Sequence, residues 1–170
     1  IRLKTIFGSS ISELDRIDST LLQSNLKMNV TPFVRGSVVI QKNKVNEGLL
    51  VEGVKYLPSF DHLVNGGRFV NDDEIIIGSS LAESLKLDSS EALYLVPLDG
   101  FIGDVKNLKY YKLIFRRAFT TGMDEYDRNL AYVSINTAQK IFNMNDKVSG
   151  YIINSDIKTD ELLNNLNDSI

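Results

Sequence analysis

The residues best suited to chemistry lie in one acid-rich segment, TTGMDEYDRNLAYVS, at residues 120–134. Asp124, Glu125 and Asp127 surround Tyr126 there. Neighbouring carboxylates can serve as general acid and general base, or hold a hard cation such as calcium. Their spacing matches no EF-hand loop, and no second acidic cluster lies nearby in the sequence. The pattern therefore favours a solvated turn, in which Asp127 accepts hydrogen bonds from local amides and Tyr126 packs with its hydroxyl in water.

The other candidates for chemistry are weaker. The single histidine, His62, follows Asp61 in a polar connection, but adjacent residues seldom face each other and no GxSxG nucleophile motif accompanies them. The chain has no cysteine, which excludes disulfides and thiolate metal sites, so a zinc site would depend almost wholly on carboxylates. The sequence predicts no catalytic residue, no metal and no cofactor.

A site of another kind is predicted between the strand patterns at 92–98 and 110–119, which could pair as a long hairpin. The tip of this hairpin, at 99–112, either folds back over the core or exposes apolar surface, and exposed apolar clusters mark partner contacts. We predict that the tip binds a partner. Its candidate contact residues are Phe101, Ile102, Val105, Leu108, Tyr110 and Tyr111.

Composition narrows the classes of function. The chain has 170 residues, 43% of them hydrophobic, which is enough for one domain or two small subdomains with a core. Its net charge of −3 provides no basic footprint for nucleic acid. No apolar run approaches the length of a transmembrane helix. Because the chain begins inside a strand-like run and ends in a helix-like run, we read it as an excised domain of a longer protein.

The periodicity of apolar residues predicts elements that position these sites. The acid-rich segment lies between the second strand of the hairpin and a strand that begins at Leu130, and it returns the chain from the hairpin. Ser10, Ser80 and Asn136 each stand where a helix N-cap is expected. The strands are predicted over 1–7, 31–41, 47–54, 74–78, 92–98, 110–119, 130–135 and 148–154, and the helices over 10–22, 80–87, 136–144 and 159–168.

This order predicts an α/β (α+β) fold with a discontinuous first subdomain. Residues 1–65 form β-α-β-β and residues 123–170 form β-α-β-α. The simplest arrangement places these ends together in one subdomain and inserts the β-rich residues 66–122 between them.

Several stretches resemble a known family of membrane transporters. TTGMDEYDRNLAYVSINTAQKIF is similar to the TGMYEYD…AFVSL…AQ stretch of the Lol family (LolC/LolE), the permease subunits of the lipoprotein-releasing ABC transporter. GGRFVNDDEIIIGSSLAESLKL, LLVEGV and KVSGYIIN are similar to further segments of that family, and the GS.LA..L pattern is shared with the broader MacB/FtsX class. The resemblance runs from about residue 30 to 155. Its structural motif falls on Gly122, Met123, Glu125, Tyr126 and Asp127.

Two departures from the family pattern are visible. Asp124 stands where the family often has tyrosine. Ser90 and Glu91 stand where the family has Gly-Asp, and losing a glycine that tolerates positive φ predicts a different turn at this place.

The resemblance implies an extracytoplasmic domain on the periplasmic side of the bacterial inner membrane, anchored there in the full-length protein. Residues 1–65 and 123–170 would be a porter-like subdomain, and 66–122 a sabre-like one. The implied partners are a second permease subunit, two cytoplasmic ATPase subunits, a periplasmic lipoprotein carrier and the lipoprotein substrate. One permease of the family recruits the carrier through a β-hairpin hook, and the corresponding place here is the tip at 99–112.

The acid-rich segment would then be a structural connection, and the domain would perform no bond chemistry. Two alternatives stay open. The first is an efflux or mechanotransmission permease domain of the MacB/FtsX kind, which would bind an adaptor or a cell-wall hydrolase activator. The second is an enzyme that uses the acid cluster or His62.

Overall fold

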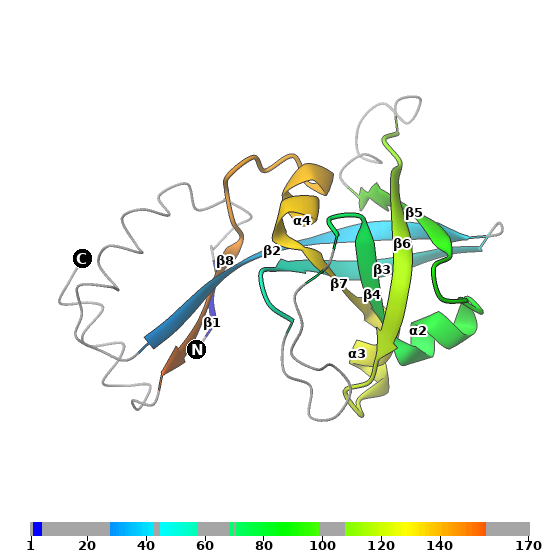
Figure 1. Cartoon of the computed structure of the whole chain (residues 1–170), viewed down its shortest axis with the longest axis horizontal. Helices are drawn as coiled ribbons and strands as arrows, with labels where there is room; N and C mark the ends of the chain where they lie inside the picture. The colour runs from blue at the N-terminus through cyan, green and yellow to red at the C-terminus, as the bar shows by residue number, and fades with distance from the viewer. Residues whose placement is uncertain are drawn as a thin grey trace. The chain divides into compact units, whose positions relative to one another are not determined.

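The computed structural model describes residues 2–4, 28–42, 45–57, 69, 71–98 and 108–155. Strands and short helices alternate along this part of the chain, which confirms the predicted α+β class (Figure 1). The elements are, in chain order, β1 (Arg2–Lys4), β2 (Met28–Lys42), β3 (Val45–Val54), β4 (Glu74–Gly78), α2 (Ser79–Ser84), β5 (Ala92–Pro97), β6 (Tyr111–Phe119), α3 (Asp124–Asn129), β7 (Leu130–Ser134), α4 (Ile135–Ile141) and β8 (Gly150–Ser155).

The chain divides into two compact units, and the boundaries differ from the predicted ones. One unit combines Ile1–Phe33 with Asp146–Ile170, and the other is Val34–Asn145. The middle of the chain is therefore inserted between the two ends, but the insertion is much longer than 66–122. It includes β3, α3, β7 and α4, which the sequence pattern assigned to the ends of the chain. The predicted helices over 10–22 and 159–168 lie outside the described residues.

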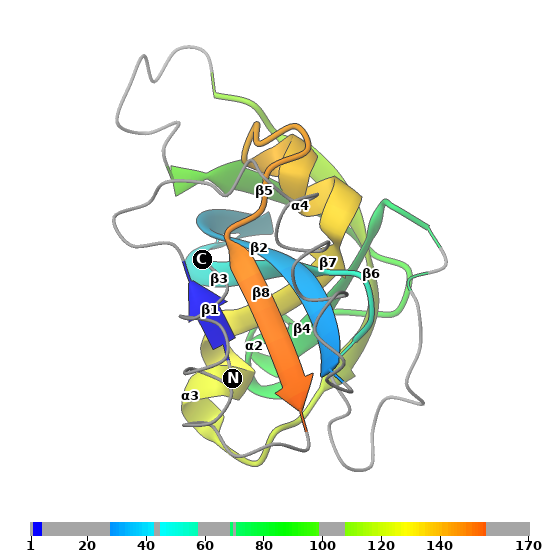
Figure 2. The ribbon, with the colours of Figure 1, turned by 90° about the vertical axis from the view of Figure 1, so that its left-hand side faces the viewer.

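In the unit made from the chain ends, β8 lies between β1 and the first part of β2, as Figure 2 shows. Both pairings are antiparallel, with Leu3 opposite Tyr151 and Pro32 opposite Tyr151 on the other side. Tyr151 and Phe33 are fully buried side chains of this unit.

In the inserted unit, the strands close into a barrel. The order β2-β3-β7-β4-β6-β5 returns to its start, because the second part of β2 also pairs with β5, with Val38 opposite Pro97. The β3–β7 and β4–β6 pairs are parallel, whereas β4–β7 and β5–β6 are antiparallel. A closed sheet has no exposed edge along which other chains could add strands. The predicted hairpin of 92–98 with 110–119 is confirmed, with Leu93 opposite Leu113.

The barrel core follows from period-2 alternation of apolar side chains. Val34, Val38 and Ile40 of β2 are buried, while Ser37 and Gln41, at alternate positions of the strand, are exposed. β4 and β7 are buried along their whole length, as expected for strands with one face on the core and the other covered by short helices. One fully buried carboxylate, that of Glu52, accepts a hydrogen bond from Arg35 Nε at 2.9 Å.

Two predicted helix starts are wrong. Helix α2 begins after Gly78 and has no side-chain cap, because its N-cap residue is a glycine. Ser80 lies inside the helix, and its hydroxyl donates to Asp124. Helix α4 is capped by Ser134 and not by Asn136: Ser134 Oγ accepts a hydrogen bond from the Thr137 amide at 3.1 Å. Ser134 in turn donates to the Asp72 carboxylate at 2.6 Å, which ties the turn before β4 to the start of α4.

The turn after α2 also corrects a prediction. Ser90 adopts φ 69, the left-handed conformation that glycine would supply, so the turn persists without the glycine. Lys86 ends α2 with φ 49, and the amides of Lys86 and Leu87 bond back to the last turn of the helix. The buried Lys42 ammonium donates to the Leu85 carbonyl at 2.8 Å, to the Lys86 carbonyl at 2.6 Å and to Glu91 Oε2 at 2.8 Å.

Candidate functional site

The acid-rich segment forms a short helix, α3, where a turn was predicted. Gly122 precedes it with φ 81, a conformation that side chains other than glycine rarely adopt. The chain then enters α3, and the amides of Tyr126 and Asp127 both donate to the Met123 carbonyl at 3.0 Å. Asp124, Glu125 and Asp127 all lie in the first turn of this helix, where carboxylates are favourable.

Asp127 is the buried member of the acidic group. Its side chain is 4% exposed, and Oδ1 accepts hydrogen bonds from both the amide and the hydroxyl of Thr121, each at 2.7 Å. Its backbone lies directly against Gly78: a Cβ atom at Gly78 would stand 2.2 Å from the Asp127 carbonyl oxygen. Asp127 therefore closes the connection between β6 and α3 and holds it against the start of α2.

Asp124 joins α3 to α2 from the solvent side. The Ser80 hydroxyl donates to Asp124 Oδ1 at 2.7 Å, and Arg128 Nε lies 3.4 Å from Oδ2. The hydrogen bond from Ser80, followed by the charge of Arg128, lowers the pKa of Asp124 below its ordinary value. A carboxyl with a lowered pKa is ionised at neutral pH, so Asp124 serves as an acceptor that links the two helices.

This geometry supports a structural interpretation of the acidic segment. Asp127 is buried against Thr121, whereas Asp124 is exposed and bonds to Ser80 of another helix. Within the described residues, no group of three His, Asp or Glu side chains could hold a metal ion. His62 lies outside those residues.

One detail of the motif corrects the sequence analysis. Tyr126 was predicted to pack, yet it is 51% exposed, and Met123 beside it is 55% exposed. The two side chains are three positions apart, about one helical turn, so they lie on the same side of the segment. This side of α3 faces solvent.

The predicted partner-binding tip is described only in part. Phe101, Ile102 and Val105 lie outside the described residues. Leu108 is half-buried and Tyr110 is 54% exposed. Tyr111 is half-buried, and its hydroxyl donates to the Lys140 carbonyl at 3.1 Å, which ties the base of the hairpin to α4.

The structure adds two exposed residues that the sequence analysis missed. Tyr94 in β5 is 44% exposed, and Leu98 at the start of the tip is 46% exposed. Tyr94 lies opposite Lys112 on the hairpin, and Lys112 is also exposed. The alternation of β5 could have identified Tyr94, because the residues on either side of it are buried. In the described part of the hairpin, the large exposed apolar residues are therefore Tyr94, Leu98 and Tyr110.

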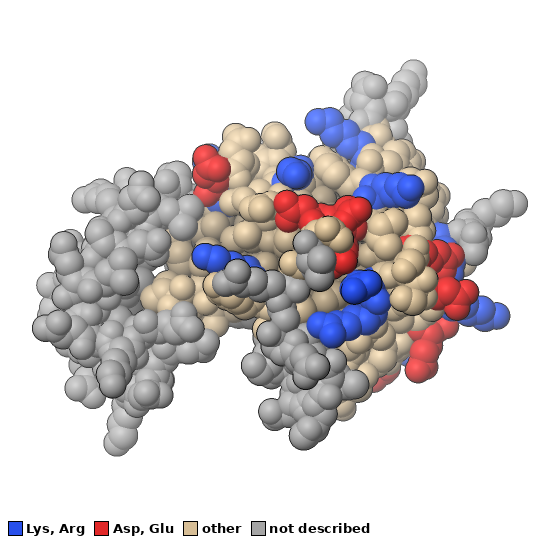
Figure 3. All heavy atoms as spheres, in the orientation of Figure 1, with Lys and Arg blue, Asp and Glu red and all other residues tan. Residues whose placement is uncertain are grey.

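The charges on the surface are mixed. On the face seen in Figure 3, Lys and Arg side chains lie among Asp and Glu side chains. No helix among the described residues is both long enough and apolar enough to cross a membrane.

Comparisons with known proteins identify solved structures with a similar fold. No protein-family model matches the sequence, and no curated protein matches it. Among solved structures, the chain is similar to the extracellular domain of the noncanonical ABC-type transporter YknZ from Gram-positive bacteria. The TM-score is 0.60 at 16% identity, over 92% of this chain and 78% of that one.

The chain is also similar to the periplasmic region of MacB from Actinobacillus actinomycetemcomitans. The TM-score is 0.56 at 8% identity, over 89% of this chain and 71% of that one. At these identities the comparison establishes a shared fold. That fold is the one found in the extracellular domain of YknZ and in the periplasmic region of MacB.

Proposed function

We propose that this chain is the extracytoplasmic domain of an ABC transporter permease, on the periplasmic side of a bacterial inner membrane. The observation that carries the proposal is the fold, which two solved domains of such transporters share over about nine-tenths of this chain. The sequence adds support of its own through the segments that resemble the permease family, which fall on β3, β4, α2, α3, β7, α4 and β8 of the structure.

The domain acts without bond chemistry in this proposal. Two of the three acidic residues that could have formed an active site, Asp127 and Asp124, instead bond to Thr121 and Ser80 within the fold. ATP hydrolysis belongs to separate cytoplasmic subunits, and the domain transmits the resulting conformational change. Its partners would include a second permease subunit.

We further propose that the transported cargo is a lipoprotein, which is released from the inner membrane and passed to a soluble periplasmic carrier. The resemblance of the TGM.EYD motif to the lipoprotein-releasing branch supports this proposal. In the fold, the Asp127 and Gly122 of this motif have a structural role. The alternative is a MacB/FtsX-type domain that binds an adaptor or a cell-wall hydrolase activator, and the fold is equally consistent with it.

The β5–β6 hairpin is the proposed carrier-binding element. Exposed Tyr94, Leu98 and Tyr110 extend its apolar surface along the described part of the hairpin. We expect Phe101→Asp with Ile102→Asp to abolish carrier binding in calorimetry while the unfolding midpoint stays unchanged. Unchanged affinity in a folded double variant would refute the role of the tip, and a large loss of stability would show that the tip belongs to the core.

Chemical crosslinking of the full-length protein in membranes tests the wider proposal. A photoreactive amino acid at Tyr110 should capture the lipoprotein carrier, and the same group at Glu125, an exposed residue of α3, serves as the control. Capture of a membrane-fusion adaptor in place of the carrier would favour the alternative function.

A further inference from the structure

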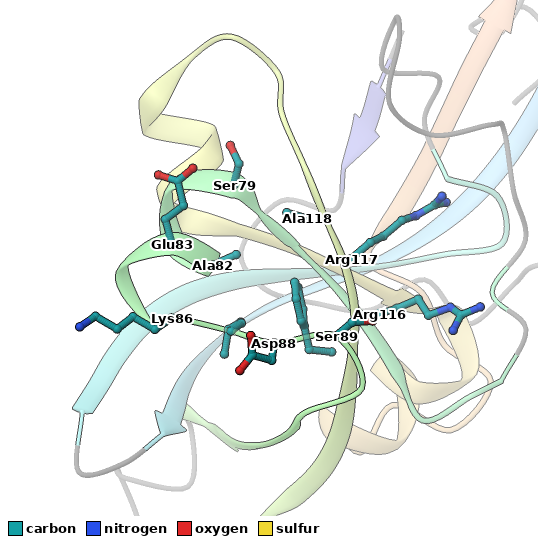
Figure 4. A pocket seen from close by; sticks show the side chains of 11 residues that line it. Ser79, Ala82, Glu83, Lys86, Asp88, Ser89, Arg116, Arg117 and Ala118 are labelled. Atoms are coloured by element: carbon teal, nitrogen blue, oxygen red, sulfur yellow. The ribbon is translucent and has the colours of Figure 1, made fainter.

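A pocket of about 640 Å³ opens between α2 and β6 on the barrel, and its lining residues belong neither to the acid-rich segment nor to the hairpin tip. Its apolar lining residues, called the floor below, are Ala82, Leu87, Phe115 and Ala118. Charged side chains surround this floor, as Figure 4 shows. An apolar floor inside a polar rim is the usual form of a site that receives one apolar side chain.

A β-bulge shapes one rim of the pocket. Ile75 of β4 lies opposite Phe115 of β6, but Ile76 lies opposite Arg117, so Arg116 is an extra residue in the strand. In a regular strand, consecutive side chains point to opposite faces. The bulge removes this alternation, and Figure 4 shows Arg116 and Arg117 extending to the same side of β6.

The two arginines form a paired cationic rim. Arg116 is 54% exposed, and its Nε lies 3.7 Å from Glu74 Oε1, which orients the guanidinium from one side. Glu74 is itself buried and accepts a hydrogen bond from Asn71 at 3.3 Å. A guanidinium offers five N–H donors in a planar fork that matches a carboxylate, so one ion pair leaves donors for a second anion.

The opposite rim carries the other sign of charge. Glu83 and Asp88 lie on the α2 side together with Lys86, and all three are exposed. Their formal charges sum to −1, against +2 for the two arginines. The pocket is thus electrically polarised across its floor, from cationic at β6 to anionic at α2.

We propose that this pocket binds an extended peptide segment of a partner protein, with an apolar side chain on the floor and a carboxylate against Arg116 and Arg117. In this peptide, the apolar residue would be followed, on the side opposite the carboxylate, by a basic residue that faces Glu83 and Asp88. This occupant fits the charge pattern of the pocket, because its carboxylate and its basic group are complementary to the cationic and anionic rims. A phosphate dianion suits the site less well, because the five rim charges together amount to only +1. The inference does not depend on the transport function.

The test is a two-dimensional NMR titration of the whole chain with two short probes. N-acetyl-Glu-Leu-Lys-amide carries the proposed pattern, and N-acetyl-Gln-Leu-Lys-amide lacks only the carboxylate. We expect saturable shifts of the Ala82, Leu87 and Ala118 amides with the first probe, with a Kd on the order of 1 mM. The second probe should bind roughly fivefold more weakly, the upper end for an exposed ion pair.

Variants assign the effect to the arginine pair. Arg116→Gln with Arg117→Gln should remove the difference between the probes, and Arg117→Gln alone should reduce it while the Arg116–Glu74 pair stays intact. Lys112→Gln, an exposed basic residue of the same strand outside the pocket, should change nothing. Equal binding of both probes, shifts away from the pocket or no saturable shift would overturn the proposal. Stronger shifts of the same amides with inorganic phosphate would assign the site to phosphate groups instead.

Discussion

Replacing Gly78 with alanine tests the contact that joins β4, α2 and α3. The added Cβ would stand 2.2 Å from the Asp127 carbonyl oxygen and 2.6 Å from its Cα. Gly78 has φ −59 and ψ 144, which alanine adopts without strain, so the whole cost is steric. The opposing atoms are backbone atoms held by the bonds between Asp127 and Thr121, and they cannot rotate away.

Overpacking of this kind costs typically 1–3 kcal/mol, and a rigid backbone partner places Gly78→Ala near the upper end, at about 2–3 kcal/mol. For a chain of this size, we expect the unfolding midpoint to fall by about 4–12 °C. Circular dichroism during thermal and urea unfolding would measure both quantities.

Gly48→Ala is the matched control for this experiment. Gly48 lies in β3, and a Cβ atom there would meet nothing within 4 Å. The substitution should be neutral or stabilising by up to about 1 kcal/mol, because alanine restricts the unfolded chain. If Gly78→Ala unfolds within about 0.5 kcal/mol of the original protein, a difference typical of an ordinary surface substitution, then α3 does not lie where the structure places it.

Three further changes test the caps and turns. Lys42→Met should lower the free energy of unfolding by about 2–3 kcal/mol in urea titrations, because carbonyls at the end of α2 lose their donor. The hydrogen bond from Lys42 lowers the pKa of Glu91 below 4.5, so its stabilisation is present above that pH and lost as the pH falls through the folded-state pKa. The variant should therefore lose less stability than the original protein on acidification, and equal losses would contradict this. Ser90→Gly should raise the free energy of unfolding by about 0.5–1 kcal/mol, since glycine adopts φ 69 without strain. A lower free energy of unfolding would count against the turn. Ser80→Ala should raise the pKa of Asp124 in a carbon-detected NMR titration, and an unchanged pKa would argue against the link between the helices.

The sequence predicted the elements whose signals are local. The β5–β6 hairpin follows from alternation over neighbouring residues, and Leu93 indeed pairs with Leu113. The closure of the barrel was not predictable in the same way. It requires Val38 to pair with Pro97 and Leu50 to pair with Leu130, and no local pattern indicates which distant strands will meet.

Capping shows the same limit at single residues. Ser80 and Ser134 are both good N-cap candidates by type, but only Ser134 caps a helix. Helix α2 begins earlier than the capping-box pattern indicated, so its N-cap position falls on Gly78. Ser80 lies inside the helix, where its hydroxyl donates to Asp124.

For the candidate site, the sequence predicted one of the contacts but not the exposure of the side chains. The carboxylate of Asp127 was correctly expected to bond to a local amide, since acids in turns and first helical turns do so. Tyr126 was misjudged, because it faces solvent although packing was expected. For Tyr111 the sequence left a covered and an exposed position open, and its hydroxyl is bonded to α4. Exposure depends on which neighbouring element covers a side chain, and the sequence around each tyrosine does not contain that information.

The most direct test of the proposed function is a calorimetric titration of this chain with the periplasmic lipoprotein carrier of the same organism. The account predicts saturable binding with a Kd on the order of micromolar, about −8 kcal/mol, that disappears when residues 100–106 are replaced by a tight turn. Absence of heat from a folded sample would contradict carrier recruitment by this chain, and retained binding after the replacement would contradict the role of the hairpin tip.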